Sequence, residues 1–238
     1  GTETPRHAFL WQGGKLERLF SDKRNSQALA INDKDEVVGT FQTRWYRSHA
    51  FLWIKGKATD LGTLKGGSSV ALAINSNGRV VGYADYSNDT HGFVWWRGSM
   101  LDMGTLGGKA SESRGINDRG QVVGGASTVK EETHACLWEK GRLHDLGTPG
   151  KGLCYANAVN NRGQIVGEWM PEGKGVQESH ALVWVRQRLY DLNSLIPKGS
   201  GWVLNSAKSI NDSGEIVGNG VFRGKFCAFI LTPVSTRR

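Results

Sequence analysis

The sequence has 238 residues, with 30 Lys and Arg against 22 Asp and Glu and a formal net charge of +8. Hydrophobic residues make up 38% and aromatic residues 9%, which is ample for a packed core and excludes a disordered chain. No apolar run reaches the roughly 18 residues of a membrane-spanning helix, so no membrane span is expected.

The basic residues are dispersed along the chain. Pairs such as Lys23-Arg24 occur, but no long run of like charges does. This distribution favours attraction to anionic partners in general and does not indicate specific binding of nucleic acid.

The cysteines, Cys136, Cys154 and Cys227, are odd in number, widely spaced and without a C-x-x-C pair. This spacing excludes a disulfide framework or a thiolate zinc site as the organising principle of the fold. Cys136 stands where other copies of the motif below have Phe, so we expect it to be a small buried hydrophobic residue.

The predicted elements form a repeat that opens with H-[AG]-[FCL]-[LV]-W. Its copies begin at His7, His49, His91, His134 and His180, with a degraded sixth, CAFIL, at Cys227. They lie 42, 42, 43, 46 and 47 residues apart, a period typical of propeller blades. In chain order the second period holds four short apolar segments bounded by turn residues: HAFLW (49–53), KATDLG (57–62), SVALAIN (69–75) and GRVVGYA (78–84).

A segment ending in Asn occurs five times, at 27–32, 70–75, 113–117, 156–160 and 207–211, and VVG or IVG follows each. Five units of four short strands predict an all-β fold, a five-bladed β-propeller of four-stranded antiparallel blades. We expect residues 1–238 to form this single domain.

The small-residue segment ending in I-N suits the crowded propeller axis, so we expect the order A-x-A-I-N, VVG, HAFLW, DLG from the axis outward. The last blade then takes its inner strands from 206–220, and LERLF (16–20) closes the ring. Either HAFLW (7–11) or CAFIL (227–231) takes the remaining place. Pairing of the N- and C-terminal segments in this way would leave no long open sheet edge.

Three phrases recur in register over residues 7 to 233: H-A-F-L-W, D-L-G-T-L-G-G and A-x-A-I-N-x-x-G-x-V-V-G. Together they resemble the HAF-repeat proteins, bacterial sequences described as extracellular repeats. The resemblance implies a secreted or surface-exposed domain, extracellular or periplasmic, whose signal peptide is absent from this chain. It implies no reaction, substrate or cofactor. The end units depart from the pattern, because Arg18 replaces the Asp of D-L, Cys227 the His and Leu231 the Trp, as expected at the ends of a repeat array.

Each repeated His has Trp four residues on and, in four copies, Asp eleven on: Asp60, Asp102, Asp145 and Asp191. A residue that every blade requires is expected to stabilise the blade, so we interpret these residues as a structural hydrogen-bond set. A metal ligand or a general base in one blade remains the alternative.

Two further motifs invite a ligand-binding interpretation. Segments such as NDKDEV (32–37) resemble truncated calcium loops, but most copies have one acidic residue or none, so we expect tight turns. GTLGG (104–108) lacks G-K-[ST] and a following helix, so we expect a crossing between blades. No metal and no cofactor is expected.

The short turns should lie on one side of each blade, and the variable loops and crossings on the other. Function tends to reside on such variable loops. There, aromatic faces beside cationic donors suit sugar rings and anionic groups, although aromatics under loops also cap cores. We predict these ligand-binding residues: Arg44, Trp45, Tyr46, Tyr86, Arg114, Trp169, Trp202 and Arg223.

Propeller enzymes that cleave glycans need paired carboxylates near the axis. The predicted inner strands offer Leu29, Leu72, Arg114, Asn157 and Lys208 between their small residues, without an acid. We therefore predict a monomeric, lectin-like or adhesion module that binds carbohydrate or an anionic polymer without catalysis. The alternatives are a polysaccharide hydrolase or lyase and a protein-interaction scaffold.

Overall fold

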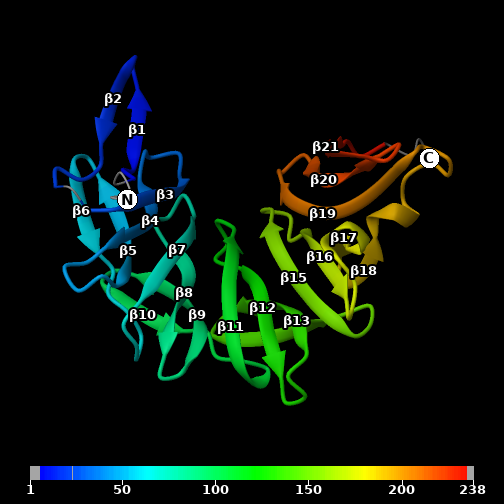
Figure 1. Ribbon diagram of the computed structural model, residues 1–238, viewed down its shortest axis with the longest axis horizontal. Helices are drawn as coiled ribbons and strands as arrows, with labels where there is room; N and C mark the ends of the chain where they lie inside the picture. Colours follow the sequence, from blue (N-terminus) through cyan, green and yellow to red (C-terminus); the bar gives the residue numbers. More distant parts are fainter. Residues whose placement is uncertain (1–5, 23, 235–238) are drawn as a thin grey trace, which may run out of the picture. The chain divides into compact units, whose positions relative to one another are not determined.

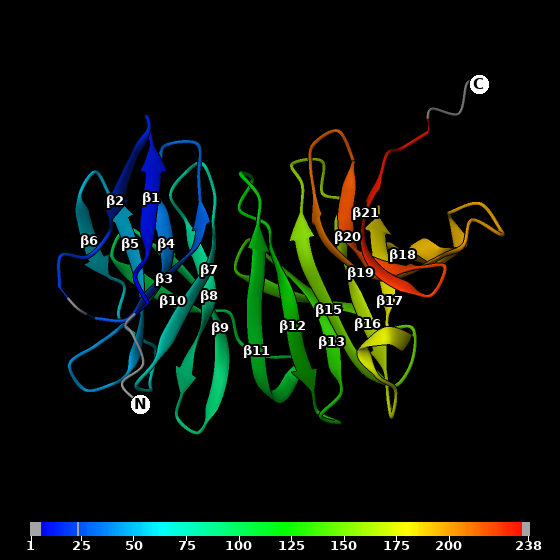
Figure 2. The same ribbon diagram turned by 45° about the horizontal axis from the view of Figure 1, so that its top comes forward.

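The computed structural model describes residues 6–22 and 24–234, and almost all its regular structure is β-strand (Figures 1 and 2). The helices in these residues are two 3-10 turns, η1 (Val176–Glu178) and η2 (Leu192–Ser194). Within this part of the chain, no helix has the length and apolar character needed to cross a membrane. The all-β class expected from the sequence is confirmed.

Four groups of four strands follow one another along the chain (Figure 1). The first two are separate antiparallel sheets, whereas the parallel bridge Thr133↔Leu153 joins the third and fourth into one eight-stranded sheet made of these two groups. Each group runs in the expected order, from the segment ending in Asn, through VVG and HAFLW, to DLG. The groups are β3 (Ser26–Ile31), β4 (Val37–Gln42), β5 (Ser48–Ile54) and β6 (Lys57–Asp60); β7 (Ser69–Ile74), β8 (Val80–Tyr86), β9 (Asp89–Trp96) and β10 (Ser99–Asp102); β11 (Gly107–Ile116), β12 (Val122–Thr128), β13 (Thr133–Glu139) and β14 (Arg142–Gly147); and β15 (Gly152–Val159), β16 (Ile165–Pro171), β17 (His180–Val185) and β18 (Arg188–Asp191).

The two ends of the chain depart from this pattern. β1 (Phe9–Gln12) pairs with β2 (Lys15–Arg18), and the last sheet contains β19 (Trp202–Ile210), β20 (Ile216–Phe222) and β21 (Lys225–Leu231). LERLF therefore pairs with HAFLW, and CAFIL supplies the third strand of the last sheet. Of the two candidates for the third place in the last blade, the structure has CAFIL, and LERLF lies with HAFLW in a two-stranded sheet. The blade count and the ring closure by LERLF remain predictions.

Packing divides the chain into two compact units, which we describe separately. The N-terminal unit is residues 1–104 with 110–113, and the C-terminal unit is residues 105–109 with 114–238. The prediction of a single domain is not tested by this division.

The cores lie between successive sheets, because side chains alternate between the two faces of a strand. In the N-terminal unit, Val38 and Leu52 of one sheet share a core with Val80 and Phe93 of the next. In the C-terminal unit, Val166 and Val183 share a core with Leu204 and Phe229 in the same way. Cys136, on the third strand of its sheet, is fully buried, as predicted.

The glycine of each VVG segment has a steric cause. In four repeats the first strand has a β-bulge at its small residues, which brings its backbone close to the second strand. A Cβ added at Gly39, Gly82 or Gly167 would lie 1.9 Å from a main-chain carbonyl oxygen of that first strand. A side chain cannot fit there, so these glycines permit the bulged pairing.

Candidate functional site

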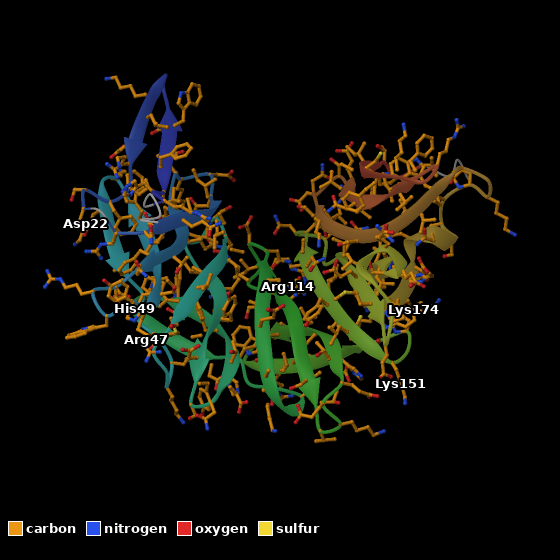
Figure 3. The ribbon with its side chains drawn as sticks, viewed as in Figure 1. Asp22, Arg47, His49, Arg114, Lys151 and Lys174 are labelled. Atoms are coloured by element: carbon orange, nitrogen blue, oxygen red, sulfur yellow. The ribbon has the colours of Figure 1, made fainter. Side chains whose placement is uncertain are left out.

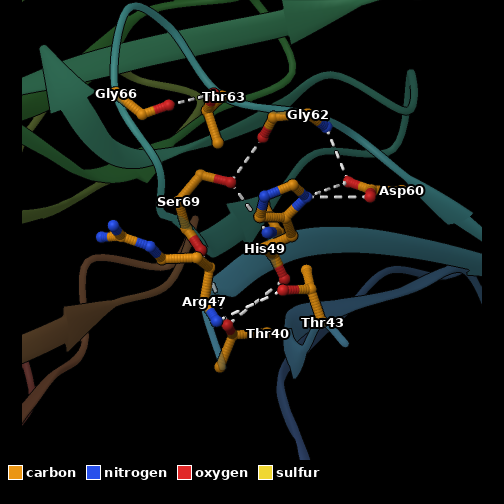
Figure 4. A network of polar contacts seen from close by, with 10 residues as sticks. Thr40, Thr43, Arg47, His49, Asp60, Gly62, Thr63, Gly66 and Ser69 are labelled. Atoms are coloured by element: carbon orange, nitrogen blue, oxygen red, sulfur yellow. Dashed lines mark hydrogen bonds and ion pairs between the residues drawn. The ribbon is translucent and has the colours of Figure 1, made fainter. Parts of the chain in front are cut away.

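The repeated His and Asp form a hydrogen-bonded pair in four repeats. His49 Nδ1 lies 2.8 Å from Asp60 Oδ2, and the same pairing joins His91 to Asp102 and His134 to Asp145 at 2.9 Å and His180 to Asp191 at 2.7 Å. Asp60 Oδ1 also accepts a hydrogen bond from the Gly62 backbone N–H at 2.8 Å (Figure 4). The carboxylate thus joins the third strand, the fourth strand and the turn that follows.

A serine from the next sheet completes this junction. The Ala50 N–H donates to Ser69 Oγ at 2.9 Å, and the Ser69 hydroxyl donates to the Gly62 carbonyl (Figure 4). Ser111 repeats the arrangement with Gly92 and Gly104. We call this set of His, Asp and Ser the strand clasp.

Cys154 occupies the serine position in the C-terminal unit, nineteen residues after Ala135 as Ser69 is after Ala50. Burial raises the pKa of its thiol to about 12, so this cysteine is not a thiolate at neutral pH.

The predicted calcium-like segments are turns closed by their first Asn. Asn160 Oδ1 accepts from the backbone N–H groups of Arg162 and Gln164 at 3.1 and 2.9 Å. Its Nδ2 donates to the Asn211 carbonyl of the next repeat at 2.9 Å, and Asn117 donates to the Asn160 carbonyl at the same distance. Among the described residues, no group of three or more His, Cys, Asp or Glu is placed to hold a metal ion.

In these contacts the recurring polar residues are hydrogen-bonded to the scaffold itself, in agreement with their structural interpretation. Within each group of four strands, strand order places the N-D-x-G and W-x-x-G turns at one end and the variable loops and crossings at the other. A binding site is therefore to be sought among the variable loops.

Trp45 and Tyr46 are the most exposed of the predicted aromatics, at 86% and 85%. They lie on the loop between β4 and β5, a tight turn in which Thr43 N–H donates to the Arg47 carbonyl at 2.7 Å and Tyr46 N–H to the Thr43 carbonyl at 3.1 Å. Tyr46 has a positive φ of 58°, so the turn is sharp and projects both rings outward. Arg44 on the same turn is also exposed.

The other predicted aromatics are packed. Tyr86 stacks on His91 with ring centroids 4.1 Å apart, and Trp169 lies against His180 at 5.3 Å, so both cover a histidine of the strand clasp. Trp202 packs on Phe222 at 4.9 Å, and the Arg223 guanidinium lies over the same Phe222 ring. These packed rings have less area open to a ligand than Trp45 and Tyr46 have. Their role in ligand binding remains a prediction.

Arg114 lies on β11, where Figure 3 labels it, and belongs to a charged cluster of the C-terminal unit. It stacks on Tyr155 at 3.7 Å and pairs with Glu168 at 3.3 Å, and Lys208 pairs with the other oxygen of Glu168 at 3.1 Å. Burial alone would raise the pKa of Glu168, but the Ser206 hydroxyl, Lys208 and Arg114 outweigh it and hold the pKa below its usual range. Sequence reasoning missed Glu168 because it follows the repeated IVG as the first residue of a variable segment.

A cavity with predicted site residues in its wall lies in the N-terminal unit and has a volume of about 750 Å³. Its wall comes from the crossing after β2, the β4–β5 loop and the ends of β5 and β6; Asp22 and His49 of this wall are labelled in Figure 3. Its charged and aromatic lining residues are Arg18, Phe20, Asp22, Arg24, Phe41, Arg44, Trp45, His49 and Asp60. We call it the arginine pocket.

Both acidic residues of the arginine pocket are engaged. The Arg24 side chain hydrogen-bonds Asp22 and holds the pKa of that carboxyl below its usual range. Asp60 is taken by the strand clasp. The Arg24 guanidinium lies 5.0 Å from the Phe41 ring centroid, which fixes it over the aromatic floor.

The structure thus brings Arg44 and Trp45 of the predicted set into one cavity and places Arg114, Trp169, Trp202 and Arg223 in the other unit. Sequence reasoning missed Arg18, Phe20 and Arg24 in this pocket. The signal for Arg18 was present, because it replaces the repeated Asp, but we interpreted that change only as the irregularity of a terminal unit.

Comparison with known proteins gives the fold. No family model and no curated protein matches the chain, so membership of the HAF-repeat family remains a prediction. TolB from Acinetobacter baumannii is similar in structure, with a TM-score of 0.60 and 13% identity over 92% of this chain and 55% of that chain. A gluconolactonase from Xanthomonas campestris has a TM-score of 0.49 and 12% identity over 97% of this chain and 80% of that chain. A lectin from Aleuria aurantia has a TM-score of 0.44 and 10% identity over 93% and 80%.

The chain spans about half the length of the TolB that it matches. At this low identity the similarity shows the fold alone, and the fold is that of a β-propeller.

Proposed function

We propose that this chain is a non-catalytic binding module that recognises carbohydrate through the loop side of its sheets, with the arginine pocket as the binding site. The observation that carries the proposal is Trp45, 86% exposed on a tight turn at a cavity that three arginines line. The recurring polar residues are used by the scaffold, whereas Trp45 and Arg44 occur in one loop only.

The chemistry of the pocket suits a sugar. An exposed Trp ring offers a flat apolar face on which a pyranose ring stacks, at low cost in conformational entropy because the side chain has few rotatable bonds. Guanidinium groups beside it donate several hydrogen bonds in fixed directions to hydroxyl or anionic groups. A volume of about 750 Å³ accommodates a ligand of a few sugar units.

The engaged carboxylates favour binding over hydrolysis. A glycoside hydrolase needs two carboxyl groups on either side of the scissile bond, one protonated and one ionised. In the arginine pocket, Asp22 is held ionised by Arg24, and Asp60 accepts from His49 and Gly62. A polysaccharide hydrolase or lyase remains the alternative enzyme, to be tested directly.

The resemblance to bacterial extracellular repeats supports a location outside the cytoplasm, in the extracellular space or the periplasm. We propose that the module acts there as a monomer. A protein-interaction scaffold is the second alternative, since exposed aromatics also serve protein interfaces.

A glycan array followed by titration calorimetry tests the proposal. We expect at least one class of oligosaccharide to bind, and Trp45→Ala to weaken its affinity at least about 10-fold, since stacking is lost. Trp11→Ala is the matched control, because Trp11 is 67% exposed in the same unit and does not line the pocket. An empty array together with a single captured protein partner would replace the proposal with the scaffold alternative, and new reducing ends or unsaturated products on incubation would indicate the enzyme.

A further inference from the structure

The first copy of the repeat has lost the pair on which the strand clasp depends. β1 and β2 pair in the register Phe9↔Arg18, as β5 and β6 pair in the register Phe51↔Asp60. Arg18 therefore occupies the position from which Asp60 reaches His49. A carboxylate that accepts hydrogen bonds has been replaced by a cation that only donates them.

The replacement leaves His7 without the partner that its counterparts have. His7 Nδ1 is buried and has no hydrogen-bond partner, whereas the Nδ1 atoms of His49, His91, His134 and His180 each face an Asp carboxylate. A buried polar atom without a partner costs free energy. Arg18 is thus unfavourable for the scaffold, which suggests that it serves another purpose.

Arg18 lines the arginine pocket together with Arg24 and Arg44. Of these three, Arg24 is committed to Asp22 and to the ring of Phe41. Within residues 6–22 and 24–234, the guanidinium groups of Arg18 and Arg44 have no ion pair or hydrogen bond. Arg44 is also near enough to Asp22 to contribute, after Arg24, to the lowered pKa of that carboxyl. Among its described lining residues, the pocket therefore has two guanidinium groups without a hydrogen-bonded partner, and both of its carboxylates have one.

We propose that Arg18 and Arg44 form an anion subsite, which binds the carboxylate or sulfate of an acidic sugar unit whose ring stacks on Trp45. The proposal rests on the proposed function and adds the class of ligand, an anionic oligosaccharide. Arginine suits the role, because its planar fork of N–H donors matches carboxylate and sulfate oxygens in bidentate fashion. Other repeats have the Asp of the strand clasp at this position. In the first repeat, the arginine that stands there recognises the ligand instead.

Substitution of Arg18 by the consensus residue tests this proposal, because it should improve the fold and abolish recognition. Arg18→Asp restores a carboxylate opposite His7, so we expect the thermal midpoint to rise by about 2–4 °C. We expect affinity for an oligogalacturonate or a sulfated oligosaccharide to fall at least about 10-fold in calorimetry, as one charge-assisted contact is lost and a repulsive charge is added. A higher midpoint excludes unfolding as the cause of weaker binding.

Three comparisons complete the design. Arg18→Gln removes the cation without adding a negative charge, and it should also weaken binding of the anionic sugar. Arg142→Gln is the matched control, since Arg142 is an exposed arginine of the other unit and should leave the affinity unchanged. A neutral oligosaccharide of equal length should bind wild type at least about 10-fold more weakly than the anionic ones, and the same probes show whether a carboxylate or a sulfate is preferred.

The outcomes separate the two proposals. If both Arg18 variants keep wild-type affinity while Trp45→Ala loses it, the anion subsite is wrong and the carbohydrate module stands. If wild type prefers the neutral oligosaccharide, the ligand class is wrong. If wild type binds no oligosaccharide, both proposals fail.

Discussion

A single carboxylate can organise three parts of a blade, as Asp60 does. It accepts from the imidazole of the third strand and from the backbone of the turn after the fourth, and Ser69 of the next sheet joins that same turn. Such short, charge-assisted contacts are stronger than neutral ones, which explains why the same residue types return at each junction. Cys154 shows that the serine position tolerates a thiol of similar size when it is buried.

Glu168 gives a prediction for the dependence of stability on pH. Its pKa in the folded chain lies below its usual value of 4.5, so the unfolded state takes up a proton before the folded state does as pH falls. The stabilisation from Glu168 is therefore complete above about pH 4.5 and is lost as pH falls through the folded pKa.

Urea unfolding of wild type and Glu168→Gln at about pH 7 and about pH 3 checks this expectation. We expect wild type to be more stable by about 1–3 kcal/mol at neutral pH, because the variant leaves Arg114 and Lys208 without their carboxylate. The difference should shrink in acid. An equal difference at both pH values would show that the carboxylate charge is not the stabilising feature.

At the scale of the strand, a glycine opposite a β-bulge sets the shape of the blade. The first strand of each of four repeats bulges at its small residues, and the second strand has no side chain to obstruct it. The pattern A-x-A-I-N followed by VVG therefore encodes one structural feature, a bulge on the first strand that requires a glycine on the second.

Gly82→Ala measures how much the free energy of unfolding depends on this glycine. Its added methyl would lie 1.9 Å from the Val70 carbonyl oxygen, so the pairing of β7 with β8 must shift. We expect the free energy of unfolding to fall by about 3 kcal/mol in urea titration, as in other overpacked interiors. Gly175→Ala is the control, because a Cβ there would meet nothing within 4 Å and its φ is −83°. Equal stability of the two variants would contradict the steric account.

At the scale of the whole chain, the repeat predicted the secondary structure, the strand order within each sheet and the roles of His, Asp and Asn. Those features recur, and recurrence distinguishes a structural requirement from chance. The sequence left open whether HAFLW or CAFIL takes the third place in the last blade, because that choice depends on contacts between distant segments, whereas the hairpin of HAFLW with LERLF forms locally. Propensity and spacing carry no information on such distant partners.

The candidate site was predicted only in part for a related reason. An aromatic residue next to a loop is equally suited to bind a ligand or to cover a histidine, and only the packing of Tyr86 and Trp169 decides between these uses. Arg24 was missed because its position over Phe41 depends on side-chain geometry. Trp45 lies on a tight turn and is 86% exposed, but before the structure nothing distinguished it from the other loop aromatics.

The net charge of +8 adds a prediction on salt. Screening shortens the reach of surface charges, so affinity for an oligogalacturonate should fall about 3- to 10-fold between about 50 and 500 mM NaCl. Affinity for a neutral oligosaccharide should change little over the same range. Calorimetry at several salt concentrations measures both, and a salt-independent affinity for the anionic ligand would argue against guanidinium recognition.

The turn asparagines Asn32, Asn117 and Asn160 each donate to a main-chain carbonyl of the next repeat, a contact that does not depend on the side chain present there. Because every repeat has a main-chain carbonyl at this position, this hydrogen bond does not depend on which repeat comes next. During evolution, a duplicated or exchanged unit can form this contact without a matching substitution at the turn that accepts it, while its variable loop diverges toward a new ligand.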